Sequence, residues 1–352
     1  MLHKLTIPFL RGKAPVPLVL LNHPSFFAIL DFIYCRARTR RRSSSALPHI
    51  HARHHDREVV PPSPPLQDIS SGRSLIRLVP PVNIRVLGSS SAGNCSLVWN
   101  GDTALMIDCG FSRTYVGSCL SSLDLDIPGI GGLLITHAHS DHVNDTSIDM
   151  LVRNRVPVIV RRELTRVLRR MYPSIERAAG LGLLEEINGG GGGAGTLGIE
   201  SFSVPHDSPG GCFGFRITDR SEGGKGAGVA VATDLGFTGG ELVEHFKDAH
   251  AIVIESNHDL AMLEGSNRPA WLKKRIREIG HLSNDQCAGF VCEVARSSTR
   301  PPAAVVLAHI SQQCNTNALA EDATAGALRL GGFPDVRVVQ SFKSLPSEIV
   351  RV

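Results

Sequence analysis

The chain lacks any Cys-x-x-Cys pair, so it offers no paired-cysteine motif for a metal or redox site. Its eight cysteines are scattered along 352 residues. Most of them lie among apolar or small residues, which is typical of buried reduced thiols. We therefore expect a reducing, intracellular compartment, most simply the cytoplasm.

The chain also lacks an uninterrupted run of about 20 apolar residues, the length that a membrane-spanning helix needs. Its most apolar stretch, residues 16–34, is broken at four positions: Pro17, His23, Pro24 and Asp31. This stretch has no good secretory cleavage pattern either. We expect no membrane span and no membrane partner.

Net positive charge is confined to the first 80 residues of the chain. The formal net charge is +4, but residues 1–80 hold 12 Lys and Arg against 4 Asp and Glu, which gives +8. The remainder therefore holds 25 against 29, which gives −4. Net charge thus gives no support for nucleic-acid binding by the body as a whole.

Residues 1–81 differ in kind from the rest, with proline pairs, three consecutive arginines at residues 40–42 and six histidines. Such an Arg-rich, acid-poor segment fits an organelle transit peptide, which we favour less than a cytoplasmic location. It equally fits sequence added by a start codon chosen too early. We expect residues 1–81 to be disordered or spurious and unnecessary for chemistry, and residues 82–352 to form one domain.

From residue 82 onward, short apolar runs alternate with turn residues and, later, with helical patterns. Strands are predicted at residues 83–87, 95–99, 103–107, 132–136, 157–160, 199–204, 212–217, 229–232, 251–255 and 303–308. Helices are predicted at residues 112–123, 146–155, 162–171, 240–247, 270–279, 284–297 and 319–330. The glycine run at residues 189–193 predicts a flexible surface loop. This order predicts an α/β fold of two packed sheets with helices outside.

The densest chemical signal is the run His137-Ala138-His139-Ser140-Asp141-His142, directly after the apolar residues 133–135. Imidazole and carboxylate are ligands that zinc, manganese and iron accept. A cluster at the end of a strand is held on a rigid edge, as a metal site requires.

Four further candidates lie at the boundaries of predicted elements. His206, Asp234 and His309 each follow a strand, and His281 precedes a helix. A single histidine at a strand end is more often structural than a metal ligand. Their shared placement changes that balance, because a site built from strand ends gathers distant residues into one cleft.

Seven of these side chains suffice for two metal ions. One ion needs about three protein ligands and an open position for water. The proposed sets are His137, His139 and His206 for one ion, Asp141, His142 and His309 for the other, with Asp234 bridging both. Two ions about 3.5–4 Å apart activate a water and stabilise the attacking and leaving oxygens of a phosphoryl displacement. Asp108 is expected to orient a ligand histidine, and His281 to donate a proton or hold a phosphate.

In these motifs the chain resembles the metallo-β-lactamase superfamily, and more specifically its YycJ/WalJ branch, whose site is similar to that of ribonuclease Z. The resemblance covers about residues 82–345. Segments 255–259 and 280–284 are more branch-specific than the histidine cluster. The motifs are Gly88-Ser89-Ser90-Ser91-Ala92-Gly93-Asn94, Ile107-Asp108-Cys109-Gly110, Thr136–His142, Pro205-His206-Asp207, Ala232–Gly236, Glu255-Ser256-Asn257-His258-Asp259, Gly280–Asn284 and Leu307–Ser311.

The resemblance implies an αββα sandwich of two mixed sheets, with a di-metal cleft at one edge. It carries the seven ligands over onto the residues named above. It also implies that His281 assists catalysis and that the substrate is double-stranded DNA, degraded from 5′ to 3′. The long inserted arm with which ribonuclease Z grips transfer RNA is absent, which argues against tRNA processing.

We therefore predict a di-metal phosphodiesterase, a 5′→3′ exonuclease that acts on DNA more than on RNA through a metal-activated water, with Asp234 and His281 as catalytic residues. Zinc or manganese is expected, with iron as a third option. The alternative is a hydrolase of a small ester, thioester or lactam, because a fold does not settle its substrate. A third, non-enzymatic interpretation is a metal-binding regulatory protein. The oligomeric state does not follow from the sequence.

Three other features have two interpretations each. The pair His258-Asp259 either lines the cleft or caps a helix. The loop at residues 89–94 either cradles a phosphate or forms a tight turn. Two basic helix faces are either solvated or follow nucleic-acid phosphates; they comprise Arg161, Arg162, Arg166, Arg169 and Arg170, and Lys273, Lys274, Arg275 and Arg277.

Overall fold

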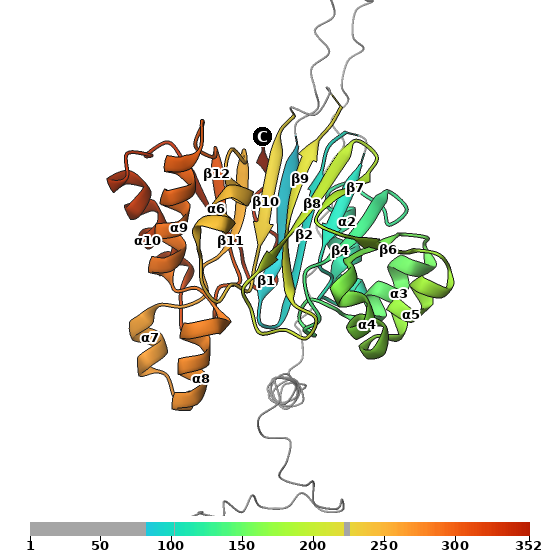
Figure 1. The fold of residues 1–352 in the computed structure, drawn as a ribbon, viewed down its shortest axis with the longest axis horizontal. Coiled ribbons are helices and arrows are strands. Elements are labelled where there is room, and N and C mark those ends of the chain that lie inside the picture. Colours follow the sequence, from blue (N-terminus) through green and yellow to red (C-terminus); the bar gives the residue numbers. More distant parts are fainter. Residues whose placement is uncertain (1–81, 102, 222–225) are drawn as a thin grey trace, which may run out of the picture.

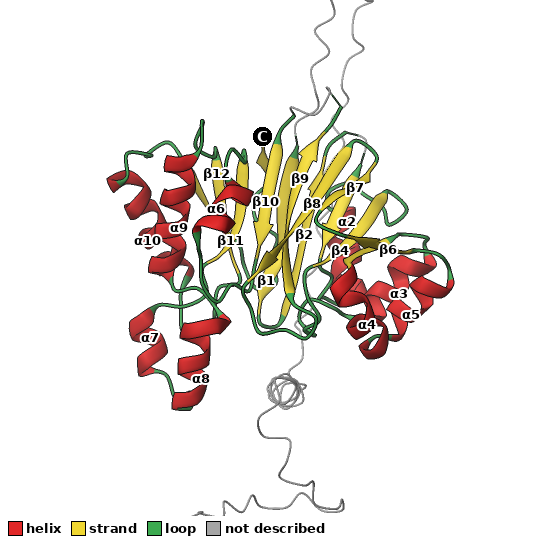
Figure 2. Ribbon diagram, viewed as in Figure 1, coloured by secondary structure: helices red, strands yellow, loops and turns green. Residues whose placement is uncertain are grey.

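The computed structural model describes residues 82–101, 103–221 and 226–352. Two seven-stranded sheets lie face to face, with helices on their outer faces (Figures 1 and 2). The prediction of an αββα sandwich with two mixed sheets is confirmed. The expectation for residues 1–81 falls outside the described residues, and the domain boundary at residue 82 stays a prediction.

The first sheet has the strand order β14-β1-β2-β3-β4-β5-β6. Its strands are β1 (Asn83–Ser90), β2 (Gly93–Trp99), β3 (Ala104–Ile107), β4 (Ile130–Ile135), β5 (Val158–Arg161), β6 (Leu184–Ile187) and β14 (Val350–Arg351). Strands β3 to β6 are parallel, so the carboxyl ends of β3 and β4 share one edge. The helices on its outer side are α2 (Arg113–Ser121), α3 (Asp145–Arg153), α4 (Arg162–Met171) and α5 (Pro173–Gly180).

The second sheet has the order β13-β12-β11-β10-β9-β8-β7. Its strands are β7 (Gly190–Ala194), β8 (Leu197–Val204), β9 (Cys212–Asp219), β10 (Gly228–Ala232), β11 (Ala251–Glu255), β12 (Ala304–Ala308) and β13 (Arg337–Gln340). Strands β10 to β13 are parallel, and β8 has the same direction because β9 is antiparallel to both β8 and β10. Its helices are α6 (Gly240–Phe246), α7 (Leu260–Gly265), α8 (Ala270–Arg275) with a π-helical turn Ile276–Gly280, α9 (Asn284–Ser297) and α10 (Asn317–Leu330).

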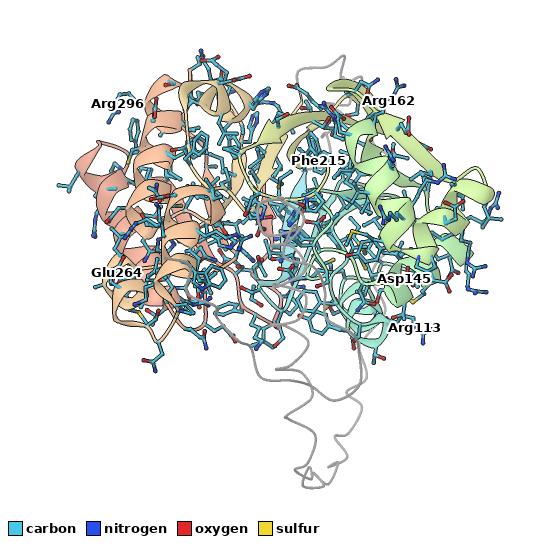
Figure 3. The ribbon with its side chains drawn as sticks, turned by 60° about the horizontal axis from the view of Figure 1, so that its bottom comes forward. Arg113, Asp145, Arg162, Phe215, Glu264 and Arg296 are labelled. Atoms are coloured by element: carbon cyan, nitrogen blue, oxygen red, sulfur yellow. The ribbon has the colours of Figure 1, made fainter. Side chains whose placement is uncertain are left out.

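Alternation along the strands divides the core into three layers. In β4, Leu133 and Ile135 pack towards the helices while Leu134 packs between the sheets. In β11, Ile254 packs towards α9 and Val253 between the sheets. Strands buried on both faces have continuous apolar sequences, which explains their clear signal. In Figure 3, Phe215 lies between the two helical layers, with Arg162 and Arg296 at the periphery.

The prediction of a loop for the glycine run is wrong. Gly190–Ala194 forms β7, paired antiparallel with β8. Glycine keeps both backbone hydrogen-bonding groups, and this strand lies at the edge of the sheet, where β8 alone supplies its pairing among the described strands. A bulge between Gly190 and Gly192 contains Gly191 at φ 114°, a conformation that glycine adopts without strain.

Most predicted elements lie close to their observed bounds, but short ones were missed. The sequence analysis did not predict α5, α7, β6, β13 or β14, which have two to eight residues each. Such elements are too short for a periodic pattern and depend on their neighbours. None of the helices in the described part of the chain is both long and apolar enough to cross a membrane.

Candidate metal centre

The carboxyl ends of strands from both sheets meet at one edge, and the predicted ligands follow those ends. Their donor atoms form overlapping groups within which all atoms lie within 4.8 Å of one another. Two of these groups match the two predicted ligand sets, and a third joins Asp234 to His137 and His142. The edge thus brings together all seven: His137, His139, Asp141, His142, His206, Asp234 and His309.

Three residues of this edge have left-handed backbone conformations. The φ angles are 58° at Asp108, 60° at Asp234 and 52° at His309, close behind the ends of β3, β10 and β12. Asp and His tolerate this region better than most residues, yet it remains unfavourable for any side chain. Conformations of this kind persist where the surrounding structure enforces them, and they concentrate at functional sites.

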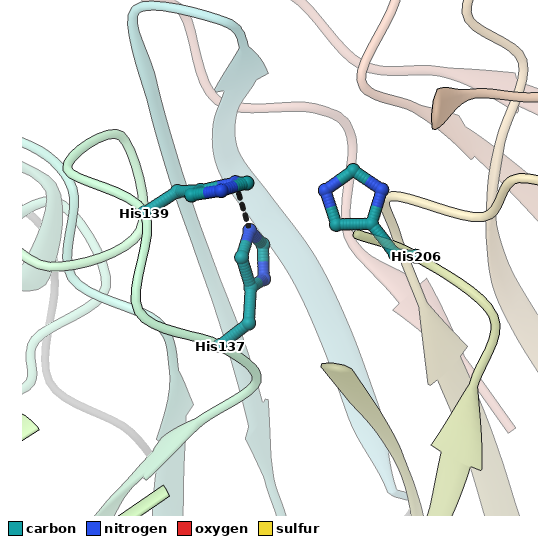
Figure 4. Close-up of side chains that lie close together, drawn as sticks. All are labelled: His137, His139 and His206. Atoms are coloured by element: carbon teal, nitrogen blue, oxygen red, sulfur yellow. Dashed lines mark hydrogen bonds between the residues drawn. The ribbon is translucent and has the colours of Figure 1, made fainter. Parts of the chain in front are cut away.

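The first ligand set comes from both sheets and converges on one space (Figure 4). His137 Nε2 lies 3.1 Å from His139 Nδ1. The His206 ring faces both, with centroid distances of 5.3 Å. Its Nδ1 donates to the Gly280 carbonyl at 2.9 Å, which leaves Nε2 as the free ring atom. Burial lowers the pKa of His137, and lowers that of His206 to about 4, so both rings are neutral and offer lone pairs.

In the second ligand set, the two histidines lie close to the Asp141 carboxylate. His142 Nε2 and His309 Nε2 lie 3.6 Å and 3.7 Å from Asp141 Oδ2. Donor atoms around one tetrahedral zinc ion with bonds of about 2.0–2.1 Å are separated by roughly 3.3 Å, which is similar. Burial opposes a charge on His309, but Asp234, Asp141 and Glu255 outweigh it and raise the pKa of His309 to about 10. A cation bound here would replace such protons.

Asp234 lies between the two sets and is 2% exposed. Its Oδ2 is 3.1 Å from His142 Nε2, and its Oδ1 is 3.5 Å from His309 Nδ1. Burial opposes ionisation of this carboxyl, but His309 and His142 outweigh it and hold the pKa of Asp234 well below its usual range. An ionised carboxylate in this position can contact ions in both groups.

Three buried ligand atoms of the cluster make no hydrogen bond of regular geometry among the described residues: His206 Nε2, His309 Nε2 and Asp234 Oδ2, which has the ion-pair contact with His142. A buried polar atom without a partner costs about 1–3 kcal/mol. All three belong to ligand types that divalent cations accept, and they are aimed at the same space as the other donors. The donor set therefore fits divalent metal ions.

The sequence analysis gave no role to Glu255, the last residue of β11, which is fully buried. Its carboxylate lies 2.6 Å from His309 Nδ1 and 2.8 Å from His281 Nδ1, and it accepts backbone N–H bonds from Leu235 and Leu282. Burial opposes its charge, but His281 and His309 outweigh it and hold the pKa of Glu255 at about 2. The available signal was an acid that ends an otherwise apolar central strand.

Asp108 contacts His142, as expected of a residue that orients a histidine of the cluster. Its Oδ2 lies 2.7 Å from His142 Nδ1, and Thr136 donates to both carboxylate oxygens. This fixes the His142 ring with Nε2 towards Asp141 and Asp234. A carboxylate that holds the far nitrogen of a ligand histidine is a common support of metal sites.

His281 lies at the mouth of the cluster, with its side chain 19% exposed. Its Nδ1 is bound to Glu255 and lies 3.7 Å from Asp234 Oδ1. Its ring centroid is 5.0 Å from that of His309. The ring is therefore close to the ligands and partly open to solvent.

The structure bears on two of the open interpretations. The Asp259 side chain accepts a hydrogen bond from Met262 N at the start of α7, which confirms the helix cap, and His258 beside it is fully buried. Residues 89–94 form a tight turn between β1 and β2. Asn94 of this turn reaches the site, and its Nδ2 lies 2.9 Å from His142 Nε2.

The comparisons with known proteins agree with this geometry. A family model described as "Beta-lactamase superfamily domain" matches residues 103–310, more than half of the chain. The chain belongs to this superfamily. Exodeoxyribonuclease YycJ of Bacillus anthracis is 28% identical over 258 residues, covering 72% of this chain and 91% of that protein. Exodeoxyribonuclease WalJ of Streptococcus pneumoniae is 27% identical over 243 residues, covering 67% and 84%.

Solved structures of this superfamily share the fold. The metallo-beta-lactamase fold protein YhfI of Bacillus subtilis superposes with a TM-score of 0.53 at 16% identity, covering 78% of this chain and all of that one. PqqB of Methylobacterium extorquens gives 0.53 at 14% identity, covering 76% and 99%. The predicted resemblance to the superfamily and its YycJ/WalJ branch is confirmed. The chain is a metallo-β-lactamase-fold hydrolase with a His/Asp cluster suited to divalent metals.

Proposed function

We propose that this hydrolase is a di-metal phosphodiesterase that degrades double-stranded DNA in the 5′→3′ direction. The observation that carries the proposal is the convergence of seven ligand side chains into two groups that Asp234 joins. The names of two relatives that it matches over most of their length, both exodeoxyribonucleases, favour DNA over RNA.

The residues divide into roles as follows. His137, His139 and His206 would hold one ion, and Asp141, His142 and His309 would hold the other. Asp234 lies between the two sets, where its carboxylate would hold both ions. Ions bound at such sites lower the pKa of a water and stabilise charge on phosphoryl oxygens. Zinc or manganese is proposed, with iron as a third option, because ligand sets of nitrogen and oxygen accept several metals.

His281 serves as the proton donor to the leaving oxygen or as a contact to the substrate phosphate. Glu255 holds its Nδ1, so Nε2 is the ring atom available to a substrate. The partly exposed position of the ring suits both roles. The proposal also includes a cytoplasmic location and a catalytic domain that spans residues 82–352.

The test is metal-dependent release of mononucleotides from a 5′-phosphorylated duplex by the full-length protein. We expect Asp234→Asn to lower the rate on the order of a thousandfold, since metal ions supply several kcal/mol of charge stabilisation. Asp124→Asn is the matched control, because Asp124 has a similar φ of 54° but is exposed after α2. Asparagine tolerates this conformation at both positions.

Two results would overturn the proposal. An intact duplex together with cleavage of a lactam, thioester or small ester would establish the alternative hydrolase. Metal-loaded protein that hydrolyses neither class faster than Asp234→Asn would favour the regulatory interpretation.

A further inference from the structure

Two large apolar side chains are exposed beside the metal cluster. Phe237 is 53% exposed and follows Asp234 by three residues, and Ile279 is 45% exposed and precedes His281 by two. Within the described part of the chain, neither side chain belongs to one of the hydrophobic clusters. Single exposed apolar residues are common on protein surfaces, whereas two beside a group of buried polar ligands call for an explanation. Phe237 and Ile279 are called the apolar platform below.

The backbone brings the two members of the apolar platform next to each other. A Cβ added to Gly236 would lie 2.4 Å from the Ile279 carbonyl oxygen, so the residue before Phe237 packs directly against the backbone of Ile279. Gly236 N also donates to the Pro205 carbonyl at 2.6 Å, just before His206. The segment that carries Phe237 is thus held between the π-helical turn and the segment of a predicted metal ligand.

Buried contacts fix the chain around the apolar platform. Leu235 is fully buried, and its N–H donates to the Glu255 carboxylate at 2.9 Å. The Gly280 carbonyl accepts from His206 Nδ1 at 2.9 Å, which ties the end of the π-helical turn to the first ligand set. The chain beside the platform is therefore held by the same contacts that position the cluster. A substrate meets an apolar surface whose backbone is already ordered, which lowers the entropy cost of binding.

The apolar platform is close enough to the cluster for one substrate to contact both. Helices α7 and α8 extend past the sheets at this edge (Figure 1), and the π-helical turn leads from α8 back to His281. Three residues of chain span at most about 11 Å and two at most about 7 Å, which bounds the distances from Phe237 to Asp234 and from Ile279 to His281. Successive nucleotides of a duplex strand rise by about 3.4 Å. The first few linkages behind a base on the platform can therefore reach the cluster.

We propose that the apolar platform binds the end of the DNA duplex, with the terminal base stacked on Phe237 and packed against Ile279. The assignment rests on the proposed exonuclease function. Inside a duplex both faces of every base pair are covered by neighbouring pairs, and only at an end is one flat face open. An aromatic ring stacks on such a face whatever the base is. The platform therefore selects ends over internal positions, the property that distinguishes an exonuclease from an endonuclease.

The kinetic arm measures kcat/KM of the full-length protein on a blunt linear duplex. Phe237→Leu keeps an apolar side chain but removes the ring, and it should lower kcat/KM about tenfold through loss of one base–aromatic stack. Phe237→Trp keeps a ring and should retain the wild-type value. The change should lie in KM more than in kcat, because the ring holds the substrate without touching the reacting atoms.

Leu181→Ala is the matched control for Ile279→Ala. Both residues are large and apolar, with exposures of 44% and 45%, but Leu181 follows α5 in the outer helical layer. Ile279→Ala should raise KM, and Leu181→Ala should not. None of these substitutions removes a side chain from a hydrophobic cluster of the described residues. The free energy of unfolding should therefore stay unchanged, so a loss of binding cannot be attributed to misfolding.

The binding arm does not depend on cleavage. The fluorescent base 2-aminopurine is placed at the 5′ end or in the middle of a duplex, and the full-length protein carries Asp234→Asn so that the DNA stays intact. Stacking on an aromatic ring changes the fluorescence of this base. The terminal probe should respond to this protein and to its Phe237→Trp derivative, whereas the internal probe should not. Phe237→Leu should remove most of the terminal response.

The outcomes separate this proposal from the exonuclease proposal. A terminal response that depends on the ring, without release of mononucleotides by the wild type, supports binding of the duplex end and refutes only the exonuclease. Equal kcat/KM and an equal terminal response in Phe237→Leu and its parent overturn the proposal. It is also overturned if Phe237→Leu weakens binding to a linear duplex and to a closed circle of the same sequence by the same factor, because the contact is then not made at an end.

Discussion

The two sheets supply the residues of the proposed metal centre in different ways. The first sheet contributes His137, His139, Asp141 and His142 from one loop of six residues after β4. The second contributes single residues after β8, β10 and β12, separated by up to 103 positions between His206 and His309. One half is therefore a local structure, and the other exists only when the sheet has formed.

Each half nevertheless contains one buried carboxylate that holds its histidines. Asp108 binds Nδ1 of His142 in the first half, and Glu255 binds Nδ1 of both His309 and His281 in the second. The dispersed half thus relies on one acid for two rings and for two backbone N–H groups. This comparison indicates that the second half is more sensitive to loss of its acid.

The largest expected effect is loss of one metal ion when one of the two ligand sets is broken. If the two sets bind separate ions, His206→Ala and His309→Ala should each bind one equivalent of metal where the wild type binds two. Activity should fall on the order of a thousandfold in both, since two-metal catalysis needs both ions. Metal analysis after gel filtration measures the stoichiometry. Two equivalents in either variant would contradict the division into sets.

The next effect tests the two carboxylates directly. Asp108→Asn and Glu255→Gln should each weaken metal binding by about 10–100-fold, as for other residues that orient ligand histidines. Glu255→Gln should lie at the upper end because it contacts two rings. Competition with a chelator gives the affinities. Equal losses in the two variants would remove the asymmetry between the halves.

Each half contains a glycine that packs closely against backbone, and replacing these glycines should have smaller effects, on stability. A Cβ on Gly110 would lie 1.8 Å from the Asp141 carbonyl oxygen, and one on Gly236 would lie 2.4 Å from that of Ile279. Replacement by alanine should lower the free energy of unfolding by about 3 kcal/mol at Gly110 and about 2 kcal/mol at Gly236.

The controls for these variants are helical glycines. Gly117 in α2 and Gly289 in α9 have open space where a Cβ would be added. Alanine at either position should raise the free energy of unfolding by about 0.5–1 kcal/mol. Urea unfolding measures all four variants, and a stable Gly110→Ala protein would contradict the close packing of the cluster loop.

The smallest effect concerns one cysteine from each half. Burial raises the pKa of Cys109 and of Cys287 to about 12. A raised pKa keeps the thiol neutral, so at pH 8 roughly one molecule in ten thousand carries a thiolate. Iodoacetamide should leave both residues unmodified in the folded protein and modify them after denaturation. Peptide mass spectrometry provides the measurement. Rapid labelling of the folded protein would contradict the prediction, because it would show that iodoacetamide reaches these thiols.

The sequence predicted the local half of the centre more fully than its support. The cluster at residues 137–142 is conspicuous because imidazoles at this spacing are rare, and the apolar run of β4 places it at a strand end. His206, Asp234 and His309 were also identified, since each follows a strand that its apolar pattern predicts. Their assignment as ligands stays a prediction.

Glu255 escaped the sequence analysis for a physical reason. The role of Glu255 depends on which rings lie beside the end of β11, which only the strand order reveals.

The left-handed backbone at Asp108, Asp234 and His309 restricts how this centre can be redesigned. Libraries at these positions should sample Asn, Asp, His and Gly, because β-branched residues would twist the chain away from the cleft before any metal chemistry is tested. Engineering of a new specificity is therefore better directed at the walls of the cleft, where the backbone conformation does not restrict the choice of residue in this way.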